Sequence, residues 1–155
     1  MLASLEQSAF STWLLGSNSI WAYPTVLTLH TLGMMVLAGA AAMIDLRLLG
    51  FGRGIPLRSM GTLFTGIWGG LILNAITGTM LFVADATKRG TSVIFLVKML
   101  LIVVGVITIL MIKRDIYRGN AEPVTVSGTA KLLAICSLLA WAAAISAGRL
   151  LAYVA

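Results

Sequence analysis

The sequence has few charged residues, and this scarcity excludes an ordinary soluble protein. Only 10% of its 155 residues are Asp, Glu, Lys or Arg, whereas a soluble domain has roughly a quarter. Conversely, 59% of the residues are hydrophobic and the mean hydropathy is +1.02. Because so few polar side chains cannot cover a surface in water, we predict an integral membrane protein in which residues 1–155 form a single membrane domain.

Cysteine and histidine occur once each, as Cys136 and His30, and this excludes several kinds of site. One cysteine cannot form a disulfide within the chain. One histidine cannot supply a bis-histidine di-haem cytochrome or a histidine-rich metal cage. The sequence also has no phosphate-binding loop, no nucleophile motif and no pair of acids within an apolar run, so we expect no enzyme active site.

Long apolar runs dominate what is present. Four runs, at about 25–49, 60–84, 93–112 and 130–154, have the roughly 20 residues that a helix needs to cross the hydrocarbon core of a bilayer. Residues 2–15 are shorter and mix Leu and Trp with Ser, Glu and Gln, which is typical of a helix lying at the membrane interface. The predicted fold is therefore an all-α integral membrane bundle of four transmembrane helices with an N-terminal amphipathic interfacial helix.

The basic residues indicate the orientation of this bundle. Of the 11 basic residues, seven lie in segments 47–58 and 113–131, and only two lie in the loop 85–92. Positive loops face the cytoplasm, so both termini are predicted to face the periplasm or cell exterior, in a bacterial inner membrane. No basic arm is interleaved with aromatics, so we expect the lipid bilayer, and not nucleic acid, as a partner.

The second run has a repeat of small residues. Gly66, Gly70, Asn74 and Gly78 recur every four residues and would form one ridge on a helix. Membrane helices associate through such ridges because backbones can approach closely there. We expect this face inside the bundle or at a contact between subunits, with Asn74 acting either as a hydrogen-bonding contact between helices or as a ligand contact.

Polar residues from three runs are predicted at one depth, in the outer leaflet. His30 lies roughly 9 Å from the outer start of its run, and Lys98 and Arg149 lie at a similar depth in the third and fourth runs. Ionisable groups inside a span usually face the bundle and mark a site. With Asn74 they would suit haem propionates, a quinone head group or a small anion. The alternatives are that Lys98 and Arg149 extend to the interface and that His30 makes only a structural hydrogen bond.

The same histidine is a candidate metal ligand. Met34 follows His30 by four residues and shares its helix face, and imidazole with thioether sulfur suits copper. Haem b would need a second axial ligand from elsewhere, such as Met80, Met99 or a second subunit.

A charged pair ends the first run. Asp45 and Arg47 lie two residues apart and so do not share a helix face. We interpret them as structural residues of a charge cluster at the inner interface, where Asp45 could pair with Lys113 or Arg114. A role in a proton path is the alternative.

Several motifs resemble those of a known group of proteins. The runs "WAYPTVLTLHTLGMMVLAGAAAMIDLRLLG", "TGTMLFVADA" and "FLVKMLLIV" resemble a family of uncharacterised bacterial four-helix membrane proteins. The matching positions are Tyr23, Pro24, His30, Asp45, Arg47, Gly50, Thr77, Gly78, Phe95 and Lys98. More distantly, the Thr-Gly and Phe-x-x-Lys elements are similar to the membrane domain of copper resistance protein D. That likeness implies a helical bundle that handles copper or haem.

Three hypotheses for function follow. The first is a small, non-catalytic membrane module that binds a redox ligand (haem, copper or quinone) around His30. The second is a structural or accessory subunit of a larger membrane complex, without its own cofactor. The third is a small homo-oligomeric transporter or channel.

Overall fold

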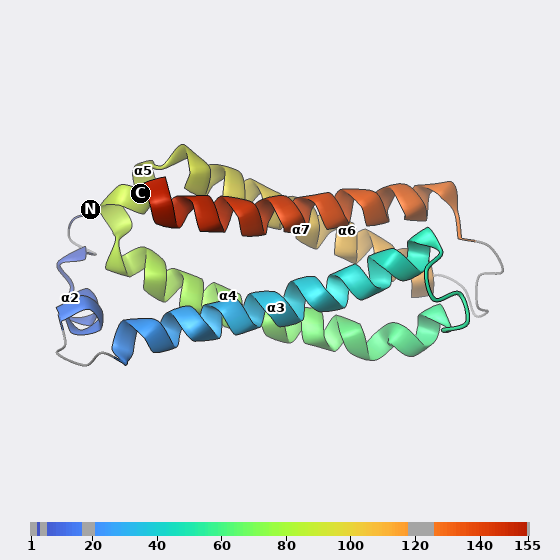
Figure 1. Ribbon diagram of the computed structural model, residues 1–155, viewed down its shortest axis with the longest axis horizontal. Helices are drawn as coiled ribbons and strands as arrows, with labels where there is room; N and C mark the ends of the chain where they lie inside the picture. The colour runs from blue at the N-terminus through green and yellow to red at the C-terminus, as the bar shows by residue number, and fades with distance from the viewer. Residues whose placement is uncertain (1–2, 4–5, 17–20, 118–125, 155) are drawn as a thin grey trace.

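The computed structural model describes residues 3, 6–16, 21–117 and 126–154, and these ranges are helical with no strand (Figure 1). In chain order the elements are α2 (Ala9–Gly16), α3 (Ala22–Leu49), the 3-10 helix η1 (Leu57–Met60), α4 (Gly61–Ala84), α5 (Ala86–Thr91), α6 (Val93–Tyr117) and α7 (Gly128–Val154).

Four segments are long and apolar enough to span a membrane: Ala22–Leu49, Leu57–Ala84, Val93–Tyr117 and Gly128–Leu151. The all-helical class and the four long apolar helices are thereby confirmed. The third helix runs to Tyr117 and not to residue 112, because helix continues through the charged residues Lys113 and Arg114, which lie beyond the apolar stretch.

The long helices are arranged as two packed pairs. α3 packs along α4, α6 packs along α7, and the contact between α3 and α7 joins the pairs. Figure 1 shows α2, α5 and the C-terminal end of α7 at one end of the molecule. At the other end lie η1, the C-terminal end of α6 and the start of α7.

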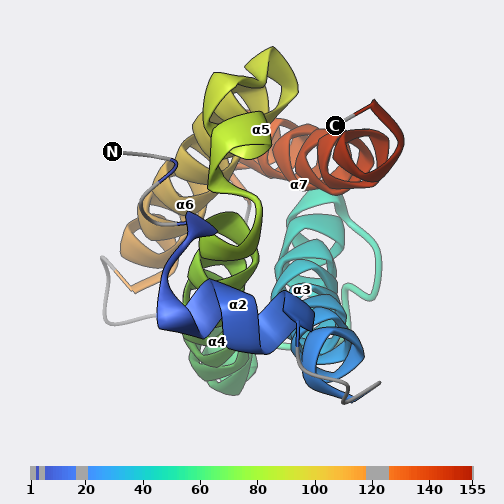
Figure 2. The same ribbon diagram turned by 90° about the vertical axis from the view of Figure 1, so that its left-hand side faces the viewer.

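The first helix of the described residues is short and lies across the bundle. The interfacial helix was expected over 2–15, but α2 covers only Ala9–Gly16, and residues 2, 4 and 5 lie outside the described ranges. Figure 2 shows α2 crossing the ends of α3 and α4. Leu14 is buried there in a small cluster with Val26, Leu81 and Ala84, while Trp13 is exposed. One face of α2 therefore closes the end of the bundle.

The small residues of α4 lie against α3, inside the molecule. A Cβ atom at Gly70 would lie 2.7 Å from the carbonyl oxygen of Gly33 and 2.9 Å from the backbone nitrogen of Leu37. At Gly66 it would lie 3.8 Å from Val36. The two backbones are thus in close contact, as the four-residue repeat of small residues predicts for a helix interface.

Candidate functional site

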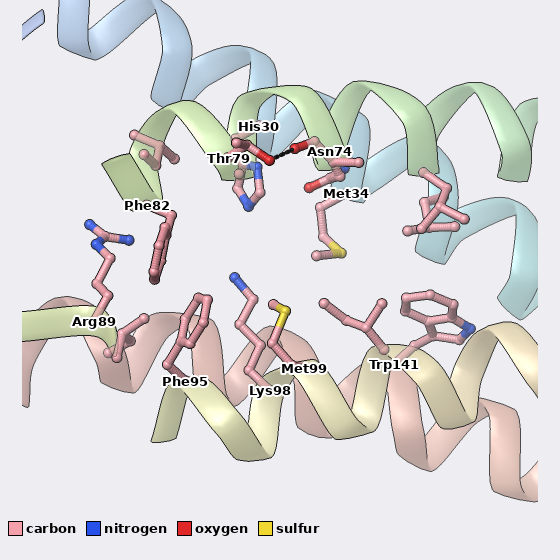
Figure 3. Close-up of a pocket in the computed structure, with 17 residues that line it drawn as sticks. His30, Met34, Asn74, Thr79, Phe82, Arg89, Phe95, Lys98, Met99 and Trp141 are labelled. Carbon is pink, nitrogen blue, oxygen red and sulfur yellow. Dashed lines mark hydrogen bonds between the residues drawn. The ribbon is translucent and has the colours of Figure 1, made fainter. Parts of the chain in front are cut away.

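A cavity of about 470 Å³ lies inside the bundle, in the half nearer α2 and α5. Figure 3 shows residues from both helix pairs around it. Its wall consists of His30, Met34, Leu37, Leu71, Asn74, Ala75, Gly78, Thr79, Leu81, Phe82, Arg89, Phe95, Lys98, Met99, Ile102, Trp141 and Leu151. Most of these side chains are apolar, so the few polar groups determine how a ligand would be oriented.

His30 is held in one orientation by α4. Its Nδ1 lies 2.9 Å from the hydroxyl oxygen of Thr77. That hydroxyl has one hydrogen, which it donates to the carbonyl of Leu73 over 2.7 Å, so it accepts from the Nδ1–H of His30. This tautomer leaves Nε2 with a free lone pair. Gly78 provides the space for the ring, because a Cβ atom there would lie 3.2 Å from Cε1 of His30.

Asn74 places an acceptor in the same wall. The residue is 8% exposed, and its amide nitrogen donates to the carbonyl of Gly70 over 3.1 Å. Its Oδ1 is buried without a hydrogen-bond partner among the described residues. Because a buried amide oxygen is costly to leave unpaired, a donor from a ligand or from water fits at this position.

Two cations approach the cavity, one from α5 and one from α6. Figure 3 shows Lys98 extending from α6 toward the ring of His30. The end of this side chain, including Nζ, also lies beside Gly148 of α7. Arg89 comes from α5, where its Nε lies 3.6 Å from a carboxylate oxygen of Asp85. Among the described residues that line the cavity, none carries a negative charge. The cavity therefore favours a ligand with an electron-rich oxygen.

Aromatic side chains form part of the apolar wall. Phe82 of α4 stacks on Phe95 of α6, with ring centroids 5.2 Å apart, and both lie beside Arg89 (Figure 3). Trp141 lies at the opposite end of the labelled group. Flat aromatic walls of this kind suit a planar ring.

The structure brings together most of the residues singled out from the sequence, but a different arginine from the expected one lines the cavity. His30, Met34, Asn74 and Lys98 all line the cavity. Arg149 does not: it is exposed on α7, and Arg89 lines the cavity in its place. Depth along a helix can be estimated from sequence, but the direction in which a helix faces cannot. Of the aromatic residues in the wall, Phe95 was noted only as a matching position in the family resemblance, and Phe82 and Trp141 were not singled out because they lie within uniformly apolar runs.

The interpretation of Asp45 as part of an interfacial charge cluster needs correction. Asp45 is fully buried and its oxygens have no hydrogen-bond partner among the described residues. The expected pairing with Lys113 or Arg114 is absent there, and the ammonium of Lys113 lies instead over the ring of Phe64. Arg47 faces another way and donates to the carbonyls of Ile55 and Arg53. Because residues two apart face different sides of a helix, Asp45 points into the core and Arg47 points toward the loop that follows α3.

These features define a helical bundle that has four helices of membrane-spanning length and an internal cavity with a polar wall near one end. The chain belongs to DUF6644, a family of unknown function, which it matches over residues 13–154. No curated protein and no solved structure matches the chain. No link to copper resistance protein D is found.

Proposed function

We propose that the protein is an integral membrane module that binds a lipophilic ring bearing hydroxyl or carbonyl oxygens, of the quinol and quinone class, beside His30. One observation carries this proposal. Nε2 of His30, an acceptor in the tautomer set by Thr77, and the ammonium of Lys98, a donor, face each other across a mostly apolar cavity (Figure 3). A hydroxyl oxygen between them would donate to the first and accept from the second.

The outer surface supports a place in the bilayer. Leu96, Leu100 and Val103 of α6 are 60%, 64% and 53% exposed. Apolar side chains exposed in such a continuous row are unfavourable in water and favourable in lipid. A ligand dissolved in the bilayer would then enter between α4 and α6, which face each other across the cavity.

The wall also suits the ring of such a ligand. Phe82, Phe95 and Trp141 offer aromatic faces, and Arg89 and the amide oxygen of Asn74 could reach a second oxygen on the ring. The reduced form has hydroxyl donors for Nε2 of His30 and Oδ1 of Asn74, so the cavity should prefer the quinol to the quinone.

Haem b is the second candidate, because His30 and Met99 line the cavity from different helices. An axial pair needs ligands on opposite sides, and Lys98 and Arg89 would suit propionates. The position of Lys98 in front of His30 favours the first candidate, since an iron ligated by Nε2 would require this ammonium to move.

Copper fits the wall less well. His30, Met34 and Met99 offer the soft donors that Cu(I) prefers. However, Lys98 and Arg89 bring two positive charges to the same space without a carboxylate among the described lining residues. In addition, the described residues contain no group of three His, Cys, Asp or Glu that could hold a metal.

The test is a titration of the detergent-purified protein with decylubiquinone and with its reduced form, followed by quenching of tryptophan fluorescence. We expect saturable binding that Lys98→Met weakens about 10- to 100-fold, since a hydrogen bond to a charged group contributes about 1.5–3 kcal/mol. Arg149→Met is the matched control, because it removes an exposed cation at similar depth on α7, and it should bind like the original protein.

Three results would contradict quinol binding. One is the absence of saturation with either form of the probe. Another is equal affinity of Lys98→Met and Arg149→Met. The third is a Soret band in the purified protein that His30→Ala abolishes, which would establish haem. A stoichiometric partner that co-purifies in the absence of any bound ligand would favour the accessory-subunit hypothesis.

A further inference from the structure

A carboxyl group is buried near the end of α3 that lies opposite His30. Asp45 follows His30 by 15 residues, which is about 22 Å along a helix. The side chain is 0% exposed, and neither oxygen has a hydrogen-bond partner among the described residues. Ser137 of α7 lies near it without meeting hydrogen-bond geometry. This hydroxyl is also 0% exposed and has no partner among the described residues.

No cation in the described part of the chain balances this carboxyl. α4 has no charged residue along its length, and α7 presents Ser137 while its Lys131 is exposed. On α6, Lys113 lies over Phe64. The other charged groups described at this end are Arg47, Arg53, Arg58, Arg114 and Asp115. None of them is hydrogen-bonded to Asp45, since neither of its oxygens has a partner among the described residues. A carboxylate buried without a counter-ion is very costly, whereas a neutral carboxylic acid is not.

Polar atoms connect this acid with the cavity. Trp141 lies one turn after Ser137 on the same face of α7 and lines the cavity. Its indole Nε1 is buried without a partner among the described residues. Unpaired buried polar atoms in folded proteins usually bind ordered water. Trp141, Ser137 and Asp45 are therefore sites where bound water would fit, between the cavity and the other end of the bundle.

A second, smaller hollow lies beyond the acid. It has a volume of about 110 Å³, and its wall includes Asp115, Ser127 and Leu48, which follows Asp45 by three residues. Asp45 thus lies between the cavity beside His30 and this smaller hollow at the other end of the bundle.

We propose that Asp45 and Ser137 form a proton-binding site, in which Asp45 is a neutral carboxylic acid near the Ser137 hydroxyl and exchanges its proton with water along the Trp141 side of α7. Exchange moves the proton from the carboxyl oxygen to a water oxygen, and the carboxylate takes a proton back from water. The site does not depend on which molecule occupies the cavity.

The test is the infrared spectrum of the full-length protein in lipid nanodiscs at neutral pH. We expect the carbonyl stretch of a neutral carboxylic acid, which is separate from carboxylate bands, and we expect it to shift when the buffer is exchanged for D2O. Asp45→Asn should remove the band. Asp115→Asn, at the end of α6, is the matched control and should retain it. Ser137→Ala should keep the band but move its frequency, because the polar group near the carboxyl is lost.

The proposal is overturned if the original protein has no such band, or if Asp45→Asn retains it. A band that stays unshifted in D2O would overturn the connection to water. If Asp45→Asn does not fold, the original protein and Ser137→Ala still decide the question. A band whose frequency Ser137→Ala leaves unchanged would contradict a site shared by Asp45 and Ser137.

Discussion

At the scale of single residues, the hydroxyl of Thr77 determines the chemistry that His30 can offer. A threonine in a helix often donates to the carbonyl four residues earlier, and Thr77 does so to Leu73. Its oxygen can then only accept from the neighbouring helix. The hydrogen bond from Thr77 to Leu73 within α4 therefore selects the Nδ1–H tautomer of His30 on α3. This tautomer leaves Nε2 available in the cavity.

This tautomer is directly measurable because the chain has one histidine. Selective 15N labelling of histidine will give the signals of a single ring, and we expect them to show protonated Nδ1 and unprotonated Nε2. Thr77→Val removes the acceptor and should shift the population toward the Nε2–H form. Thr31→Val is the control, since the Thr31 hydroxyl bonds only within α3 and is exposed. An unchanged ring spectrum in Thr77→Val would show that Thr77 does not set the tautomer.

At the scale of elements, the close contact of α3 and α4 produces the site. Gly70 allows the two backbones to meet, and the next residues on the same ridge are Asn74 and Gly78. Asn74 lies against Gly33, and Gly78 lies against the ring of His30. The residues that pack the helices therefore also decide where the polar groups of the cavity lie.

Alanine substitutions at the adjacent Gly69 and Gly70 will distinguish the effect of packing on stability from the effect of helix propensity. Gly70→Ala places a Cβ against backbone atoms of α3, so we expect a loss of about 1–3 kcal/mol, as for an overpacked core. Gly69→Ala meets no atom within 4 Å and should leave stability unchanged or slightly raised, because alanine favours helix. The midpoint of thermal unfolding in detergent is the measurement. Equal unfolding midpoints for the two variants would contradict the close contact of Gly70 with the backbone of α3.

At the scale of the whole molecule, the two ends of the bundle differ. The cavity lies toward α2 and α5, and the buried acid lies toward η1 and the C-terminal end of α6. The basic segments at the η1 end predict that this end faces the cytoplasm. The cavity would then open in the outer half of the bilayer, and Asp45 would lie in the inner half.

Labelling with a membrane-impermeant maleimide will test this orientation. In a Cys136→Ala background, Thr91→Cys lies on α5 and Gly54→Cys lies in the connection before η1, and both positions are exposed. We expect Thr91→Cys to react in cells with a permeable outer envelope and an intact inner membrane. Gly54→Cys should react only after the inner membrane is opened. The reverse pattern would invert the orientation, and labelling of both in intact cells would argue against a spanning bundle.

The sequence by itself determined the all-helical class, the positions of the four long apolar helices and the small-residue ridge on α4. These follow from composition, run length and a four-residue repeat, which are local properties of the chain. It also singled out His30, Met34, Asn74 and Lys98, because polar or soft side chains stand out in apolar runs.

Only the tertiary structure decided which of these residues face one another. It brings Arg89 to the cavity and leaves Arg149 exposed, and it buries Asp45 beside Ser137 away from the basic loops. The physical reason is rotation about the helix axis: one residue turns the side chain by about 100°. In a helix that is apolar on every side, no sequence pattern fixes that angle, whereas packing against the neighbouring helices does.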